Sequence, residues 1–373
     1  MFDPAQLKSK ATYPRPGAFY SLAGNLANRR LYAGNSDGSI QVFDLAAAEK
    51  LTAEKLAAEK KEPTAVWTKH DNFVSALAFV PRPPARLVIS GSYDRTLVWW
   101  DADLGEVLRT VAAHEGWVRG LEPFPDGGRL ASVGDDMTVR LWETDGGKPA
   151  GVFAGHATRT PQGHPTALYA VAISPDGRFV ASGDRIGEVR VWESDSGKLA
   201  QLFQVPILYT YDPRQRKRSI GGIRSLTFSP DGGRLAVGGM GQVENVDGMA
   251  GKARIEIWDW RQPRPLAALE GEGHKGIVNH LQFMGNEWLI GAGGGSDDGF
   301  LAVWRPEAPP PAAAATAGTA GAADTAQPVE LVPSAPARMI KTGGHTHRLV
   351  LHEAAQELYA AGHGKLEVWG WGG

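Results

Sequence analysis

One sequence pattern recurs along the chain and constrains its fold more than any other feature. It consists of a small-residue segment, a turn with Asp or Gly, and alternating apolar residues that end in an aromatic side chain. The seven copies are AGNSDGSIQVFD (33–44), SGSYDRTLVWWD (90–101), SVGDDMTVRLWE (132–143), SGDRIGEVRVWE (182–193), ARIEIWDW (253–260), GSDDGFLAVW (295–304) and AGHGKLEVWG (361–370). Because apolar and polar residues alternate, each copy predicts two β-strands joined by a tight turn.

Further predicted strands flank the copies. Alternating stretches lie upstream, as at 74–80, 169–177 and 223–232, and the Pro-Asp-Gly that closes the last two is a turn signal. A shorter outer strand completes each unit, for example within 105–115 or 198–203. Four strands per unit, repeated seven times, predict a β-propeller, because a flat sheet of that many strands would leave exposed edges.

His and Trp residues recur in pairs within these units. The pairs are His70 with Trp100-Asp101, His114 with Trp142-Glu143, His164 with Trp192-Glu193, and His274 with Trp304. A His near the start of a repeat and Trp-Asp near its end are the signature of WD repeats, so nearly the whole chain resembles the WD40-repeat β-propeller family. The resemblance implies an all-β, seven-bladed propeller that forms a single domain over residues 1–373.

The two ends of the chain are expected to close the ring together. The last copy ends near Gly373, so no residues remain for its outer strand. WD40 propellers commonly take that strand from the other terminus, which the resemblance assigns here to residues 1–16. Deletion of residues 1–15 is therefore expected to destabilise the whole ring.

Two long insertions separate neighbouring copies, and the resemblance puts both on the bottom face. Residues 45–62 consist of strong helix formers, with Lys50/Glu54 and Lys55/Glu59 spaced for ion pairs, and predict a short surface helix. This helix is interpreted as a solvated spacer; the alternative is a partner-binding helix that uses Leu51 and Leu56. Residues 306–337 are rich in Pro and Ala and predict a flexible loop.

Three other insertions are expected to meet on the opposite, top face. They comprise residues 155–162, 205–221 and 238–254, which belong to adjacent predicted blades. The second carries a basic loop of four positive charges, Arg214, Arg216, Lys217 and Arg218. A solvated charged loop is the first interpretation, and a site for an acidic or phosphate-bearing partner is the second.

Several His, Ser and Asp residues have the side-chain types of a hydrolase triad. They recur at the same repeat positions, whereas an active site needs a single copy. The resemblance implies a buried hydrogen-bonded network that joins the strands of a blade. Its expected members are His70, Ser90, Asp94, Trp100, His114, Ser132, Asp136, Trp142, His164, Ser182, Trp192, His274, Asp298 and Trp304. Ile186 and His363 stand where the network Asp is expected, and the fifth unit has no recognisable His or Asp.

Metal and cofactor chemistry find little support in the sequence. There is no cysteine, so disulfides, thiolate metal sites and cysteine nucleophiles are excluded. His345, His347, His352 and His363 cluster near the C-terminus, but no carboxylate stands nearby at ligand spacing. No phosphate-binding loop, HExxH or GxSxG motif occurs. We therefore predict no metal site, no cofactor and no catalytic residue.

In WD40 domains the partner-binding residues lie beside the first strand of each blade and just before the turn Asp. The resemblance transfers that role to Phe73, Tyr93, Trp117, Arg119, Asp135, Tyr169, Arg185, Arg224, Asn279 and Asp297. Aromatic and Arg side chains are enriched at interface hot spots, and we expect Trp117 to be the central contact. The alternative is that Trp117 and Phe73 pack against neighbouring loops.

The sequence therefore predicts a non-catalytic scaffold that binds a peptide or partner domain around blades 2 to 5. A propeller enzyme acting at the central channel is one alternative. A nucleoprotein component that contacts phosphate through the basic loop is another, although the formal charge of −2 argues against a dedicated nucleic-acid binder. Without a signal sequence or membrane span, we expect a monomeric propeller within a cytoplasmic complex. The Ala, Gly and Arg content and the lack of Cys suggest a bacterial source.

Overall fold

Strands make up nearly all of the regular structure of the residues that can be described. The computed structural model describes residues 2–46, 62–82, 85–213, 218–243, 251–295, 298–306 and 331–372. Four short 3-10 helices accompany the strands: η1 (Pro4–Gln6), η2 (Leu26–Asn28), η3 (Pro206–Leu208) and η4 (Glu353–Ala355). The predicted helix at 45–62 and loop at 306–337 lie mostly outside the described residues. Within these residues, no helix has the length and apolar character needed to cross a membrane.

Five antiparallel sheets each contain four strands in chain order. The first is β5 (Val74–Arg82), β6 (Ala85–Ser92), β7 (Thr96–Asp101) and β8 (Val107–Ala112). The second is β9 (Val118–Pro123), β10 (Arg129–Gly134), β11 (Thr138–Glu143) and β12 (Pro149–Ala154). The third is β13 (Leu168–Ile173), β14 (Phe179–Asp184), β15 (Glu188–Glu193) and β16 (Leu199–Gln204). The fourth is β19 (Ile223–Phe228), β20 (Arg234–Met240), β21 (Lys252–Asp259) and β22 (Arg264–Lys275). The fifth is β23 (Ile277–Met284), β24 (Trp288–Gly294), β25 (Gly299–Trp304) and β26 (Arg338–Lys341).

A six-stranded sheet joins the two ends of the chain. Its order is β27 (Thr346–His352), β28 (Glu357–Gly370), β1 (Lys8–Asn25), β2 (Arg30–Asn35), β3 (Ser39–Asp44) and β4 (Ala65–Thr68). The first part of β1 pairs with β28, from Lys8 opposite Gly370 to Ala18 opposite His363. The second part pairs with β2, from Phe19 opposite Asn35 onward. A two-stranded ribbon, β17 (Tyr209–Asp212) and β18 (Arg218–Gly221), completes the sheets of the described residues.

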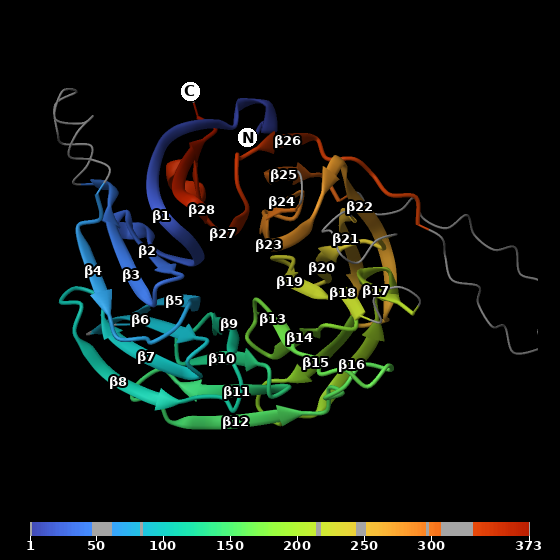
Figure 1. The fold of residues 1–373 in the computed structure, drawn as a ribbon, viewed down its shortest axis with the longest axis horizontal. Helices are drawn as coiled ribbons and strands as arrows, with labels where there is room; N and C mark the ends of the chain where they lie inside the picture. Colours follow the sequence, from blue (N-terminus) through green and yellow to red (C-terminus); the bar gives the residue numbers. More distant parts are fainter. Residues whose placement is uncertain are drawn as a thin grey trace, which may run out of the picture.

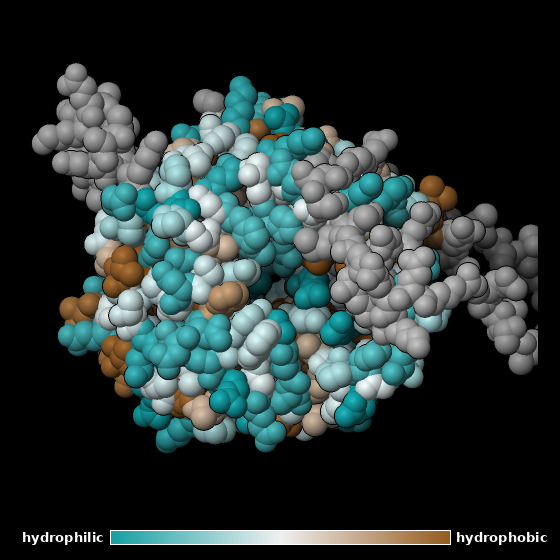
Figure 2. All heavy atoms as spheres, in the orientation of Figure 1, coloured by the Kyte–Doolittle hydropathy of each residue, from teal (hydrophilic) through white to brown (hydrophobic). Residues whose placement is uncertain are grey.

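The sheets stand around a common axis, as in a propeller, and the two termini lie at the same point of the ring (Figure 1). The predicted all-β WD40-type propeller is thus confirmed. Inner strands β1, β5, β9, β13, β19, β23 and β27 contribute the walls of a central channel with a volume of about 630 Å³. Figure 2 shows the hollow at the centre of one face, with hydrophilic side chains around it.

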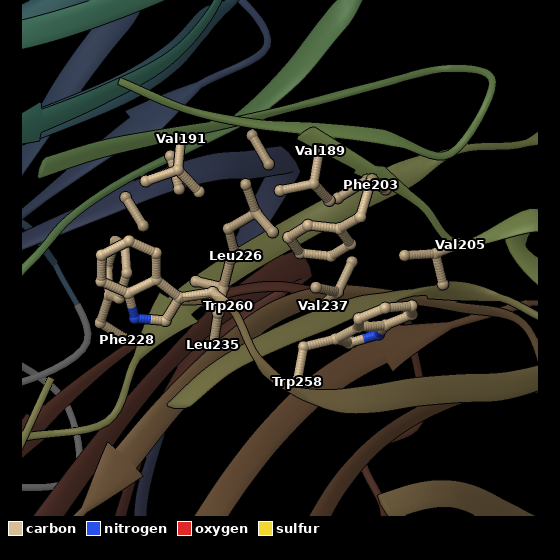
Figure 3. Close-up of a cluster of buried hydrophobic side chains, with 14 of the residues drawn as sticks. Val189, Val191, Phe203, Val205, Leu226, Phe228, Leu235, Val237, Trp258 and Trp260 are labelled. Atoms are coloured by element: carbon tan, nitrogen blue, oxygen red, sulfur yellow. The ribbon is translucent and has the colours of Figure 1, made fainter. Parts of the chain in front are cut away.

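Apolar side chains fill the space between neighbouring sheets. Val189 and Val191 of β15 and Phe203 of β16 pack against Leu226, Val237 and Trp258 of the next sheet (Figure 3). The rings of Phe203 and Trp258 stack with their centroids 4.5 Å apart. Each sheet therefore buries its faces only against its neighbours, as expected for a repeat architecture.

Candidate interaction surface at the channel mouth

One face of the propeller collects two kinds of loop. Successive antiparallel strands run in opposite directions, so the loop before each inner strand and the loop between the second and third strands lie at the same end of a sheet. We call this end the top face. Phe73 and Trp117 precede β5 and β9, and Tyr93, Asp135 and Arg185 lie in the loops that follow β6, β10 and β14.

Four aromatic rings form a continuous stack along the top face, which we call the aromatic arc. Tyr20 and Phe73 stack with centroids 5.1 Å apart and planes 11° apart. Phe73 and Tyr93 follow at 5.5 Å and 26°, and Tyr93 and Trp117 at 4.4 Å and 7°. Trp117 at the end of the arc remains 44% exposed. The arc thus offers an apolar contact surface next to the channel.

Arg119 fixes the geometry of the arc at its inner side. Its Nε and Nη2 donate to the two carboxylate oxygens of Asp135 at 2.7 and 3.0 Å, and its Nη1 donates to the Tyr93 hydroxyl at 2.8 Å. The guanidinium carbon lies 4.8 Å from the ring centroids of both Tyr93 and Trp117 and 5.2 Å from that of Tyr169. Burial lowers the pKa of Arg119, but the bonds to Asp135 outweigh it and leave the pKa raised. Arg119 is therefore a firmly charged cation among three rings.

Arg224 and Arg185 bring further positive charge to the mouth. The guanidinium carbon of Arg224 lies 3.7 Å from the Tyr169 ring centroid, and its Nη2 donates to the Gly221 carbonyl at 3.2 Å. Its Nε is buried without a hydrogen-bond partner among the described residues. Burial, with repulsion from Arg119 and Arg185, lowers the pKa of Arg224. Arg185 donates to the Ser219 carbonyl at 3.3 Å.

Three histidines extend the surface beyond Tyr20. The rings of His345 and His363 stack at 5.1 Å, and His347 lies 4.8 Å from His363 and 4.7 Å from Tyr20. Burial first, and then repulsion from the other two histidines, lowers the pKa of His347 to about 3. His352 is not part of this group, since its Nδ1 lies 3.4 Å from the Tyr359 hydroxyl.

Two predicted surface residues have other placements. Asn279 donates from Nδ2 to the Thr346 carbonyl at 3.1 Å, so it joins β23 to β27. Asp297 lies outside the described residues, as do Arg214, Arg216, Lys217 and the side chain of Arg218. The three top-face insertions do meet: the Tyr209 hydroxyl donates to Gln162 at 2.8 Å, and the amide of Val243 donates to Thr210 at 3.2 Å.

Two units contain the complete predicted network. His70 lies 2.7 Å from both Asp94 and Ser90, and Trp100 Nε1 donates to Ser90 at 2.8 Å. In the next unit His114 lies 2.9 Å from Asp136 and 2.7 Å from Ser132, and Trp142 donates to Ser132 at 2.9 Å. The hydrogen bonds join the second and third strands of each sheet, and the turn between them, to the loop before the inner strand.

The fourth unit requires a correction, because His156 and not His164 completes it. His156 lies 2.8 Å from Ser182, and Trp192 donates to the same hydroxyl at 3.0 Å. The acid is also displaced: Asp184 and Glu188, on either side of Ile186, lie 3.2 and 3.3 Å from His156. His164 is exposed on the inserted loop, since the insertion follows the network His instead of preceding it.

The members of the last predicted network that can be described have other partners. Trp304 Nε1 points to the Glu270 carbonyl at 3.5 Å, and Asp298 accepts from the amide of Gly299 at 2.7 Å. The side chain of His274 lies outside the described residues. In the fifth unit other hydrogen bonds replace the His–Ser–Trp network: Glu256 accepts from Trp258 Nε1 at 3.1 Å and from Arg254 at 2.9 Å.

Comparison with known families agrees with this geometry. The sequence model of the family described as WD domain, G-beta repeat, matches residues 61–101, 105–143 and 147–193. The chain therefore contains three WD40 repeats. The matched segments end at the aromatic strands β7, β11 and β15, whose Trp residues donate to the network serines.

Curated relatives match only part of the length of this chain. A nuclear distribution protein PAC1 of Arthroderma benhamiae is 43% identical over 86 residues, which is 21% of this chain and 19% of the relative. A nuclear distribution protein nudF of Emericella nidulans is 31% identical over 132 residues, which is 30% of this chain and 27% of the relative. The match thus spans about a fifth to a quarter of the relatives.

These relatives correct the expected source. They come from fungi, including Arthroderma and Emericella, which contradicts the bacterial origin inferred from composition. An Ala- and Gly-rich composition without cysteine is not restricted to one kingdom.

The sequence analysis did not single out several polar residues inside the channel. Glu122 of β9 and Arg348 of β27 face each other, with carboxylate and guanidinium atoms 3.7 Å apart. His280 of β23 accepts from the amide of Leu349 at 3.2 Å, and burial lowers its pKa well below the ordinary value. In the sequence they are ordinary polar residues on inner strands, and only the closed ring brings them together.

Among the described residues, one cluster has the spacing of a metal site: His156, Asp184 and Glu188. Arg190 already pairs with Glu188, with Nε and Oε1 2.6 Å apart. Together with the bonds to Ser182 and Trp192, this makes the cluster a variant of the structural network.

Proposed function

We propose that this WD40 protein is a non-catalytic interaction scaffold that binds a peptide or partner domain on its top face. The observation that carries the proposal is the aromatic arc, held from behind by Arg119 and ending in the half-exposed Trp117. Tyr, Trp and Arg are the side chains most enriched at interface hot spots. A rigid β scaffold that presents them on loops is a common arrangement for recognition.

We further propose that the ring has seven blades. The six-stranded sheet would then count as two blades, which share β1. In support, β1 and β28 are 18 and 14 residues long, against 6 residues for β2 and β3. Both β1 and β27 also contribute to the channel wall, as expected of the inner strands of two separate blades. The top-face site would then lie around blades 2 to 5, in a protomer that acts within a larger complex.

The enzyme alternative is less favoured by the channel contents. Glu122 is paired with Arg348, and His280 already uses its Nδ1 to accept a backbone hydrogen bond. A general base would need a free lone pair directed at a substrate. The nucleoprotein alternative depends on the basic loop 214–218, of which no side chain is described. The relatives are named for nuclear distribution, and we carry over to this chain only the repeat that they share.

The decisive test replaces Trp117 with Ala and measures capture of a native partner from lysate. We expect W117A to lose the partner that the intact protein recovers, while its thermal transition stays within about 2 °C, because an exposed side chain contributes little to folding. The matched control is Leu108→Ala, which removes an exposed apolar side chain on the outer strand β8. Unchanged capture by W117A would contradict the proposal.

A further inference from the structure

The charges at the channel mouth are unbalanced. Arg119, Arg185 and Arg224 lie near enough for mutual repulsion to affect Arg224. Asp135 pairs with Arg119. Among the described residues, neither Arg185 nor Arg224 forms an ion pair with a carboxylate; their guanidinium groups donate to the backbone carbonyls of Ser219 and Gly221. Within the described part of the chain, two positive charges at the mouth thus lack an anion.

Of these two cations, Arg224 is the one that lies in the channel wall. Its guanidinium is stacked on the ring of Tyr169 and lines the channel wall. The buried Nε has no hydrogen-bond partner among the described residues, and only Nη2 donates to a backbone carbonyl. A partly buried cation with unused donors is costly unless an anion completes it, and a guanidinium fork matches a carboxylate or phosphate in two hydrogen bonds.

The same geometry disfavours a cationic ligand. Aromatic rings at such a mouth could otherwise hold a Lys or Arg side chain through cation–π contacts. Here Arg119 already occupies the space over Tyr93, Trp117 and Tyr169. Of the described charged groups at the mouth, a second cation would meet three guanidinium groups and the carboxylate of Asp135.

We propose that the top face recognises an anionic side chain of a peptide, a carboxylate or a phosphate, which Arg224 and Arg185 bind at the channel mouth. Neighbouring apolar residues of the peptide lie along the aromatic arc. This inference rests on the proposed function, since it names the chemistry of the partner at the same surface.

The test selects peptides from a randomised heptapeptide library with the full chain and measures each selected peptide by fluorescence anisotropy. We expect Asp or Glu to be enriched at one position. Replacing that acid by its amide should weaken binding at least tenfold. A phosphoserine peptide that binds more tightly than the glutamate peptide identifies phosphate as the preferred anion; equal or weaker binding identifies carboxylate.

Variants of the protein test which residues cause the preference for an acid over its amide. Arg224→Gln should reduce the ratio of the affinities for the acid peptide and the amide peptide to about one. Arg185→Gln should reduce this ratio partly. Lys198→Gln also removes one positive charge, but from an exposed site on the outer rim, and should leave the ratio unchanged. The amide peptide tests the inference without altering the protein, so a poorly folded Arg224 variant does not obscure the result.

Two results would overturn the inference, and they are distinguishable. If the selected peptides depend on Trp117 but are neutral or basic, the scaffold stands and anion recognition fails. If no selected peptide loses affinity with W117A, the top-face site itself fails, and the anion inference fails with it.

Discussion

At the scale of single residues, the two complete networks show how the blades are held. Asp136 contacts the ring of His114, the amide of Glu115 and both the amide and the hydroxyl of Thr138. Burial alone would raise the pKa of Asp136, but these hydrogen bonds, led by that of His114, hold it well below its usual range. The carboxylate is therefore a structural anion that ties the turn after β10 to the loop before β9.

Asp136→Ala should accordingly destabilise the fold. Removal of the carboxylate leaves His114 Nδ1 without its partner in a buried setting, which costs about 1–3 kcal/mol. Urea denaturation followed by tryptophan fluorescence measures the change. Glu106→Ala, which alters an exposed carboxylate on the outer edge, is the control and should stay within about 0.5 kcal/mol of the parent protein. Equal stability of the two variants would contradict a structural role for Asp136.

The low pKa of His347 predicts that the stability of the fold depends on pH. Its pKa in the folded protein is about 3, against 6.5 for an ordinary histidine, so below pH 6.5 the unfolded state binds the additional proton. The contribution of His347 to stability is thus complete above pH 6.5 and falls as the pH drops toward 3. The raised pKa of His156 acts in the opposite direction: its contribution is complete below 6.5 and is lost as the pH rises through the folded pKa.

His347→Gln should therefore reduce the loss of unfolding free energy between pH 7 and pH 5. That interval lies above the range in which ordinary carboxylates titrate, so histidines dominate the difference. Urea denaturation of both proteins at the two pH values measures it. The same pH slope in parent and variant would show that His347 is not buried and neutral in the folded state.

At the scale of elements, the turn between the second and third strands imposes one backbone conformation. Gly38, Arg95, Met137 and Gly187 occupy the same position, with φ of 86°, 75°, 62° and 85°. Each of their amides donates to the carbonyl three residues earlier. The left-handed conformation favours glycine. Two blades nevertheless place a side chain there, because the hydrogen-bonded turn and the network Asp beside it hold the backbone in this conformation.

Gly187→Ala tests the steric demand of this turn. A Cβ at Gly187 would lie 2.6 Å from the carbonyl oxygen of Val205, so the backbone of the following loop must move. Gly146→Ala is the matched control, because its φ of 93° is equally unfavourable but nothing lies within 4 Å of the added Cβ. We expect Gly187→Ala to cost about 1–2 kcal/mol more than Gly146→Ala in urea denaturation. Equal costs would mean that strain alone, and not the contact, restricts this position.

The elements also show what sequence can and cannot predict. The alternation of apolar and polar residues predicted the all-β propeller, because this period of two residues is visible within a single strand. The choice of His164 failed because Gly155-His156 and Gly163-His164 carry the same signal on either side of the insertion. The stacking of Tyr20 on Phe73 could not be predicted, since residues from different sheets meet only around the closed ring.

At the scale of the whole molecule, closure depends on a short N-terminal segment. Leu7 is fully buried among residues of the fifth and sixth sheets, and Tyr13 packs in the cluster beside β28. The Phe2 ring makes edge contacts with Trp288 and Trp371 at 5.6 and 5.3 Å. Sheets in a ring support one another through their faces, so opening the ring at one sheet exposes the faces on both sides of the gap.

Deletion of residues 2–15 should consequently destabilise the entire propeller. Loss of Leu7 and Tyr13 alone removes about 5 kcal/mol or more of buried contacts, and β28 becomes an exposed edge strand. Thermal unfolding followed by circular dichroism should show a lower and broader transition for the whole molecule. A synthetic peptide of residues 2–15, added in trans, should restore the transition, whereas a scrambled peptide of the same composition should not. If the truncated protein unfolds at the parent temperature, the segment is an appendage and the ring is closed by other contacts.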